Sequence, residues 1–203
     1  MKDPAKNPAF ESSFSFTGTI TGIRKEGKTM QLLIHQDVFS GRFPTEFKLI
    51  VPLGILLTEE FPYVKGDVVF IEDALFYMKD SEFRLRIEDM TQIRSTTAQP
   101  GEVNAFSFSG EIVDVSKEQG YMLAVLKQSV QDFFETSLEL VIPDSVKLEK
   151  MPKKGDIGFI KSASLYDKEG SVRARIARPT YKVLYSPDVV MKLGTIEAKE
   201  LFI

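Results

Sequence analysis

A five-residue phrase occurs twice in this chain of 203 residues. It reads FSFTG at 14–18 and FSFSG at 106–110, a spacing of 92 positions. Four further landmarks recur in the same order, with spacings of 89 to 91: IVP at 50–52 and VIP at 141–143, KGD at 65–67 and 154–156, ALFYMKD at 74–80 and ASLYDKEG at 163–170, and FRLRI at 83–87 and VRARI at 172–176. Five ordered matches indicate a duplicated unit of roughly 80 residues, enough for one small domain.

The hydrophobic pattern within each unit is typical of β-strands. Apolar residues and glycine alternate with serine and threonine along 14–21, the period of two expected when one face of a strand is buried. A turn at 26–28 and a short apolar, helix-like link at 53–64 separate strands of the first unit. The predicted strands are 14–21, 30–36, 45–51, 68–78 and 83–90 in the first unit, and 106–116, 121–128, 135–142, 157–165 and 171–178 in the second.

This order of elements predicts the fold class. Three strands, a short helix and two more strands form the five-stranded Greek-key barrel called the OB-fold, so we expect an all-β chain with two such barrels in tandem. Gly18 and Gly110 lie inside the long first strands, where a bend lets one strand pair with both halves of a barrel. The predicted organisation is a flexible N-terminal arm at 1–12, a first barrel at 13–94, a linker at 95–104, a second barrel at 105–178 and a C-terminal tail at 179–203.

Three of these features resemble one known family. The long first strand, the KGD turn before the fourth strand and the alternating RxRI strand are similar to those of the single-stranded DNA-binding proteins of bacteria and their phages. Two barrels in one chain resemble the double-barrelled members of that family. The resemblance implies non-catalytic, sequence-tolerant binding of single-stranded DNA in DNA replication, recombination or repair. Because OB-folds also bind RNA, sugars and proteins, the fold alone does not determine the ligand.

Composition excludes several classes of function. The formal charge is −3, from 26 Lys and Arg against 29 Asp and Glu, so strong binding of duplex DNA through phosphates is not expected. The chain has no Cys and no run of about 20 apolar residues, which favours a cytoplasmic protein without disulfides or membrane spans. The single histidine, His35, has no partners at metal-ligand spacing. Asp67 and Asp156 follow glycine in a repeated turn, where turn capping explains them better than catalysis. We expect no enzyme, metal or cofactor.

The first unit carries the stronger binding candidates. OB-folds bind ligands on the face of strands 2 and 3 and with the loops that join strands 1–2 and 4–5. The first of these loops carries three cations, and the connection between strands 2 and 3 places two phenylalanines beside two more cations in a polar loop, a composition suited to base stacking. Phe43 either stacks bases or caps the barrel end. These candidates are Arg24, Lys25, Lys28, Phe39, Arg42, Phe43 and Lys48.

The second unit and the fifth strands supply further candidates. The arginine pairs at 84/86 and 173/175 either follow a phosphate backbone or are solvated charges paired with carboxylates such as Glu72 and Asp73. Two tyrosines at matched ends of the fourth strands either stack bases or fill the core. The candidates are Tyr77, Arg84, Arg86, Lys117, Tyr121, Lys127, Phe133, Tyr166, Arg173 and Arg175.

An alternative function is a structural or adaptor protein whose barrels bind other proteins in a multi-subunit or phage assembly, which the acidic net charge favours. The C-terminal tip has a faint similarity, at Glu197, Glu200 and 201–203, to the acidic tips that recruit replication or recombination proteins. Strands at the barrel edges can also pair between chains, so the sequence leaves open whether the protein forms a homo-oligomer. The sequence does not separate DNA from RNA as the ligand.

Overall fold

The computed structural model describes residues 12–56, 61–79, 82–130 and 134–185, and about two thirds of these residues are in β-strands, with very little helix. The first unit contains β1 (Ser12–Glu26), β2 (Thr29–Val38), β3 (Phe43–Pro52), β4 (Val68–Lys79), β5 (Glu82–Arg86) and β6 (Ile93–Ser95). The second contains β7 (Asn104–Glu118), β8 (Tyr121–Val130), β9 (Phe134–Pro143), β10 (Ile157–Lys168), β11 (Ser171–Arg175) and β12 (Tyr181–Tyr185). No described helix is long and apolar enough to cross a membrane.

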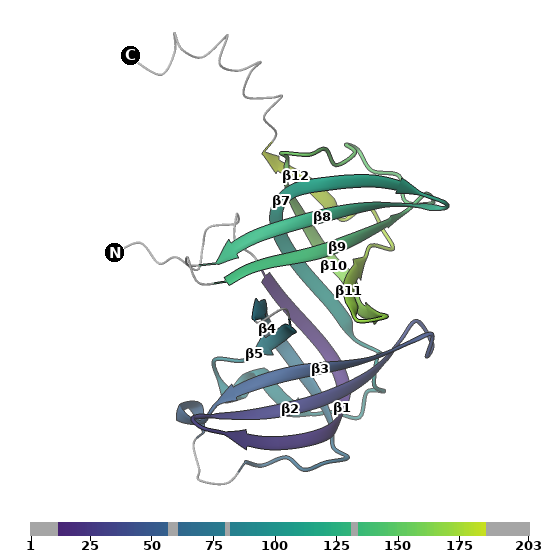
Figure 1. The fold of residues 1–203 in the computed structure, drawn as a ribbon. Coiled ribbons are helices and arrows are strands. Elements are labelled where there is room, and N and C mark those ends of the chain that lie inside the picture. Colours follow the sequence, from purple (N-terminus) through teal and green to yellow (C-terminus); the bar gives the residue numbers. More distant parts are fainter. Residues whose placement is uncertain (1–11, 57–60, 80–81, 131–133, 186–203) are drawn as a thin grey trace, which may run out of the picture.

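Each unit closes into a barrel with OB-fold topology. The strand order is β1-β2-β3-β5-β4 in the first unit and β7-β8-β9-β11-β10 in the second, and β4 and β10 return to pair with β1 and β7. The β3–β5 and β9–β11 pairs are parallel, whereas the remaining pairs in both barrels are antiparallel. Figure 1 shows the two barrels as separate lobes. The predicted all-β, tandem OB-fold architecture is therefore confirmed.

The helix expected between the third and fourth strands differs in detail. In the first barrel the described part of this link contains one 3₁₀ turn, Leu53–Ile55. In the second barrel residues 144–156 form turns without a helix. The second link carries four lysines and only a few apolar residues, so a helix there would have no continuous apolar face to bury.

A sixth strand extends each barrel. β6 pairs with β4, and β12 pairs with β10 in the equivalent place. Residues 181–185 were predicted to belong to a tail, so the boundary at 178 is corrected: the second unit continues at least to Tyr185. The short run YKVLY packs because Tyr181, 6% exposed, fills the space beside Gly158, which has no side chain.

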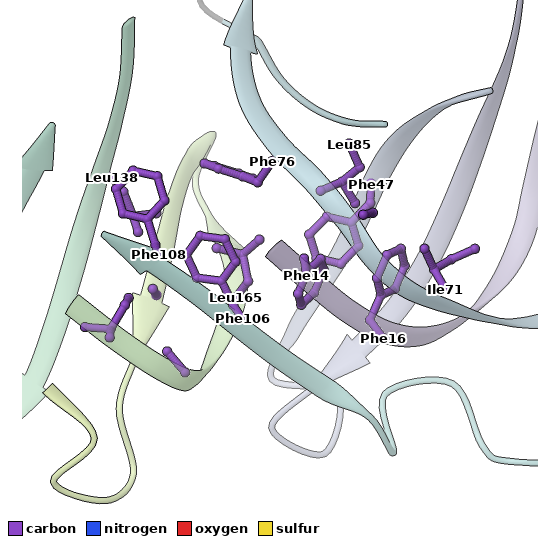
Figure 2. Packing of buried hydrophobic residues seen from close by; sticks show 14 of the residues in the cluster. Phe14, Phe16, Phe47, Ile71, Phe76, Leu85, Phe106, Phe108, Leu138 and Leu165 are labelled. Carbon is purple, nitrogen blue, oxygen red and sulfur yellow. The ribbon is translucent and has the colours of Figure 1, made fainter. Parts of the chain in front are cut away.

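The repeated phrase joins the two barrels. β1 and β7 pair antiparallel, and Phe14 faces Phe106 in the register. Because these residues occupy the same position in the two units, the pairing has the symmetry of a two-fold axis within a single chain. Figure 2 shows the phenylalanines of β1 and β7 in one continuous apolar cluster, with Phe76 of the first barrel near Phe106 and Phe108 of the second. The barrels therefore share a core.

A buried polar network fixes the connection between the barrels. The Gln36 amide, fully buried, donates to the backbone oxygens of Thr17 and Val103 at 3.0 and 2.8 Å. The Asn104 side chain donates to Gln36 Oε1 at 2.8 Å and accepts from Leu165 N at 2.7 Å. These bonds satisfy polar groups that would otherwise be buried without partners. These contacts hold the two barrels close together.

Candidate nucleic-acid interface

A groove lies on the outer face of the first barrel. Its cavity of about 390 Å³ is bordered by the β1–β2 hairpin and floored by β3, β4 and β5. Period-two alternation places most apolar residues of these strands inside the barrel and leaves every second side chain facing outward. The lining residues are Glu26, Thr29, Gln31, Ile50, Leu75, Tyr77, Lys79, Arg84 and Arg86. This is the face on which OB-folds bind ligands.

Cations surround this groove. Lys79 and Arg86 line it, are exposed, and have no salt-bridge partner among the described residues. Arg84 Nη2 lies 3.4 Å from Glu82 Oε2, so that arginine is partly neutralised. The arginines do not pair with Glu72 or Asp73: Glu72 pairs with Arg94, and Asp73 accepts a hydrogen bond from Ser15.

The β1–β2 hairpin adds three more exposed cations. Arg24 pairs in register with Gln31 and shares a strand face with Glu26, and both Gln31 and Glu26 line the groove. Lys25 and Lys28 occupy the same hairpin end. The structure thus places two candidates from β5 in the groove lining, and three from the first loop on the hairpin that borders it.

Tyr77 lies on the groove floor but offers little ring surface. Its side chain is 8% exposed. Burial raises the pKa of Tyr77, and the nearby guanidinium groups of Arg84 and Arg86 lower it by a smaller amount. The hydroxyl is therefore protonated at neutral pH.

The β2–β3 hairpin of the first barrel lies on the corresponding face of the second barrel. The Phe43 and Phe39 rings lie 4.8 and 5.4 Å from the Tyr166 ring. The Arg175 guanidinium lies over Phe39 at 5.7 Å. Four predicted site residues from two barrels thus form one cluster, which we call the aromatic clasp: Phe39, Phe43, Tyr166 and Arg175. Both phenylalanines are half-buried, and Arg42 between them is exposed.

Most of the other candidates on the second barrel are ion-paired. Lys117 pairs with Asp144, and Lys127 pairs with Glu135. Arg173 Nε donates to Glu139 Oε2 at 2.6 Å. Burial raises the pKa of Tyr166, while the guanidinium groups of Arg173 and Arg175 lower it by a smaller amount. Tyr121 is half-buried near Tyr166. Phe133 lies outside the described residues.

A second cavity, of about 460 Å³, lies between the barrels. It is lined by three glutamates and one lysine, Glu46, Glu82, Glu139 and Lys48, with apolar and small residues from both barrels. Lys48 Nζ lies 2.7 Å from Glu82, and this hydrogen bond lowers the pKa of the Glu82 carboxyl. Lys48 thus belongs to an acidic cavity.

Sequence reasoning missed three residues at these sites. Lys79 is the last residue of β4, beside the groove, and it matches Lys168, the last residue of β10. This match between the repeats was a signal that could have identified Lys79 as a candidate. Thr45 and Thr136 occupy equivalent positions of β3 and β9, each following a phenylalanine by two residues. Each accepts a hydrogen bond from the other barrel, from Asp167 N and Met78 N respectively, both at 3.1 Å. The shared FxT pattern was the available signal.

The turn aspartates behave as expected. Asp67 accepts a hydrogen bond from Val64 N, and Asp156 accepts one from Lys153 N. His35 lies 3.3 Å from Asp37 on the barrel surface. Within the described part of the chain, no group of three or more His, Cys, Asp or Glu residues could hold a metal ion.

Comparison with known proteins supports the fold. No protein-family model and no curated protein matches the sequence. The chain is similar to two solved structures of the single-stranded DNA-binding protein from Thermus aquaticus. For a deletion mutant of that protein, the TM-score is 0.60 at 16% identity, covering 89% of this chain and 97% of that one. For the wild-type protein the TM-score is also 0.60 at 16% identity, covering 87% and 94%. At this identity the similarity shows a shared fold.

Proposed function

We propose that this protein binds single-stranded DNA without catalysis, in the groove of the first barrel. The observation that carries the proposal is the set of cations around that groove, at the face that OB-folds use for ligands. Lys79, Arg86 and the hairpin cations Arg24, Lys25 and Lys28 have no salt-bridge partners among the described residues. The solved structures with a similar fold are of a protein whose name states that it binds single-stranded DNA.

The groove suits a flexible strand better than a duplex. Its cations contact phosphates, while the half-buried Leu75 gives a base an apolar contact. Contacts with phosphates and base faces do not depend on sequence, so binding is sequence-tolerant. A net charge of −3 keeps the protein from coating duplex DNA through general electrostatics. The role that fits this activity is in replication, recombination or repair.

The adaptor alternative has less support from the surface. The exposed large apolar side chains among the described residues are Ile23, Val64, Met151 and Leu184, from four separate segments. Scattered exposed apolar residues are normal and do not define a protein-binding patch. Any recruitment of partners through the tip at 197–203 concerns residues outside the described part of the chain.

A salt-dependent titration tests the proposal. Fluorescence anisotropy of a labelled thymidine oligonucleotide should rise at low salt, and log K should fall with log salt with a slope of about −3.5 if five cations contact phosphates. Arg86→Ala should make this slope shallower by about 0.7 and weaken binding. The matched control is Arg94→Ala, since Arg94 is exposed and paired with Glu72 away from the groove. No binding at low salt would refute the function. An RNA oligonucleotide that binds far more tightly would reassign the ligand.

A further inference from the structure

A carboxylate lies between two cations beside the groove of the first barrel. Glu82 Oε2 accepts hydrogen bonds from Lys48 Nζ at 2.7 Å and from Arg84 Nη2 at 3.4 Å. We propose that Lys48 and Arg84 form a phosphate-binding position, and that Glu82 occupies this position in the free protein as a built-in competitor. This inference rests on the proposed function and deepens it, because it identifies a residue that sets how tightly the strand is held.

The register of the sheet brings the two cations together. β3 and β5 pair in parallel with Leu49 beside Leu85, so Lys48 and Arg84 are the preceding neighbours on the two strands. Leu49 and Leu85 are fully buried in the barrel, and the residues before them therefore point outward. Like charges at neighbouring positions of two strands repel each other, so an anion between them is favourable.

The equivalent positions of the second barrel carry a different set of charges. In the order of Lys48, Arg84 and Glu82, the matching residues are Glu139, Arg173 and Ser171. Arg173 Nε donates to Glu139 Oε2 at 2.6 Å between paired strands, so this arginine has its carboxylate on β9 and none at the start of β11. The first set has two cations and one anion, whereas the second has one of each. The first set therefore keeps a surplus cation that a phosphate can use.

Glu82 is the most accessible member of the set. Its side chain is 54% exposed, whereas those of Lys48 and Arg84 are 29% and 19% exposed. The Lys48 ammonium, and to a smaller extent the Arg84 guanidinium, hold the pKa of the Glu82 carboxyl below its usual value, so the carboxyl is ionised at neutral pH. Ion pairs as exposed as these contribute little net stability, so the carboxylate can leave the cations at low cost.

A phosphodiester can replace this carboxylate. It carries the same single negative charge, and its oxygens accept hydrogen bonds from ammonium and guanidinium groups as carboxylate oxygens do. Arg84 lines the groove, whereas Lys48 and Glu82 line the cavity between the barrels, so the set lies where the two meet. A strand held by the other groove cations presents its phosphates here at a high effective concentration. The exchange therefore favours a bound strand over a free phosphate ion.

Removal of the carboxylate charge tests the inference. Glu82→Gln keeps the shape of the side chain, but its neutral amide no longer competes with a phosphate. Affinity for a thymidine oligonucleotide should rise about fivefold, the effect of one unit charge at about 4 Å in water. The matched control is Glu72→Gln, which changes the net charge equally at an exposed residue paired with Arg94. At about 0.1 M salt, which screens distant charges, it should change affinity less than about twofold. Thermal denaturation of each variant confirms that it is folded.

A double-mutant cycle identifies the cation that receives the phosphate. Lys48→Met removes the charge and keeps most of the side-chain length. In the Glu82→Gln background it should cancel most of the gain in affinity, because the position then lacks one of its two cations. In the wild-type background it should weaken binding less than about twofold, because Glu82 already engages Lys48, and this difference between the backgrounds measures the coupling. A double variant that keeps the full gain would overturn the inference.

The outcomes separate this inference from the proposed function. If neither wild type nor Glu82→Gln binds the oligonucleotide at low salt, the proposed function fails and the inference fails with it. If wild type binds and Glu82→Gln binds no more tightly, or if Glu72→Gln gives an equal gain, the protein binds DNA but Glu82 does not compete with a phosphate. A selective gain with Glu82→Gln that depends on Lys48 supports both.

Discussion

Phe14 and Phe106 face each other across the antiparallel pair of β1 and β7, with ring centroids 6.0 Å apart. They occupy the same position in the two repeats, so the phrase that reveals the duplication is also the contact that joins its halves. A symmetric dimer interface has this property, in which equivalent residues meet on the axis. Here the interface lies within one chain and is continuous with both barrel cores.

The shared core predicts that both barrels unfold together. Phe106→Leu keeps the position apolar but loses ring contacts with Phe14 and Phe76, and should cost about 1 kcal/mol of unfolding free energy. Denaturant unfolding should remain a single transition by both circular dichroism and tyrosine fluorescence. Val64→Ala, at a site 63% exposed, is the control and should change little. Two separated transitions would contradict the shared core.

The cross-barrel hydrogen bonds predict matched effects of two substitutions. Thr45→Val and Thr136→Val each leave a backbone N–H of the other barrel without its hydroxyl acceptor. Each should cost about 1–3 kcal/mol, because both threonines are fully buried. Urea denaturation measures the change. A cost for one threonine without the other would mean that the two contacts are not equivalent.

The bend in each first strand depends on glycine. A Cβ at Gly18 would lie 2.7 Å from His35 O, and one at Gly110 would lie 2.7 Å from Lys127 O. Backbone cannot yield as a flexible side chain does, so Gly18→Ala and Gly110→Ala should each destabilise the fold by about 1–3 kcal/mol. The control is Gly54→Ala, where the added methyl meets nothing within 4 Å. Thermal melts in which Gly18→Ala matches wild type would contradict the close approach.

Tyr181 predicts a loss of stability at alkaline pH. Burial, and then the nearby Asp156 carboxylate, raises the pKa of Tyr181. The folded state therefore keeps a phenolic proton that the unfolded chain releases near pH 10, so this contribution is complete below about pH 10 and is lost as pH rises further.

Tyr181→Phe tests that assignment. Its hydroxyl has no hydrogen-bond partner among the described residues, so the variant should be about as stable as wild type or up to about 1–3 kcal/mol more stable at pH 7. Its stability should also fall less between pH 9 and 11 than that of wild type. Urea denaturation at each pH measures this change. An equal fall in stability in both proteins would assign the alkaline effect to other tyrosines.

Local patterns were enough to predict the strands and the barrels, because period-two alternation and the order of turns depend on neighbouring residues. The path of β12 was missed, since its pairing with β10 depends on the space beside Gly158, a contact distant in sequence. For the same reason the loop position of Phe39 and Phe43 suggested free rings, whereas the structure packs them on Tyr166 of the other barrel. Contacts between the repeats do not follow from the residue pattern within each repeat.

Lysine footprinting tests the central claim most directly. The wild-type protein is acetylated with and without a bound thymidine oligonucleotide, and modification is mapped by mass spectrometry. Lys25, Lys28 and Lys79 should be protected by the strand, whereas Lys168 and Lys182 on the second barrel should react as in the free protein. Protection that spares Lys79, or that extends equally to Lys168, would contradict a binding site in the groove of the first barrel.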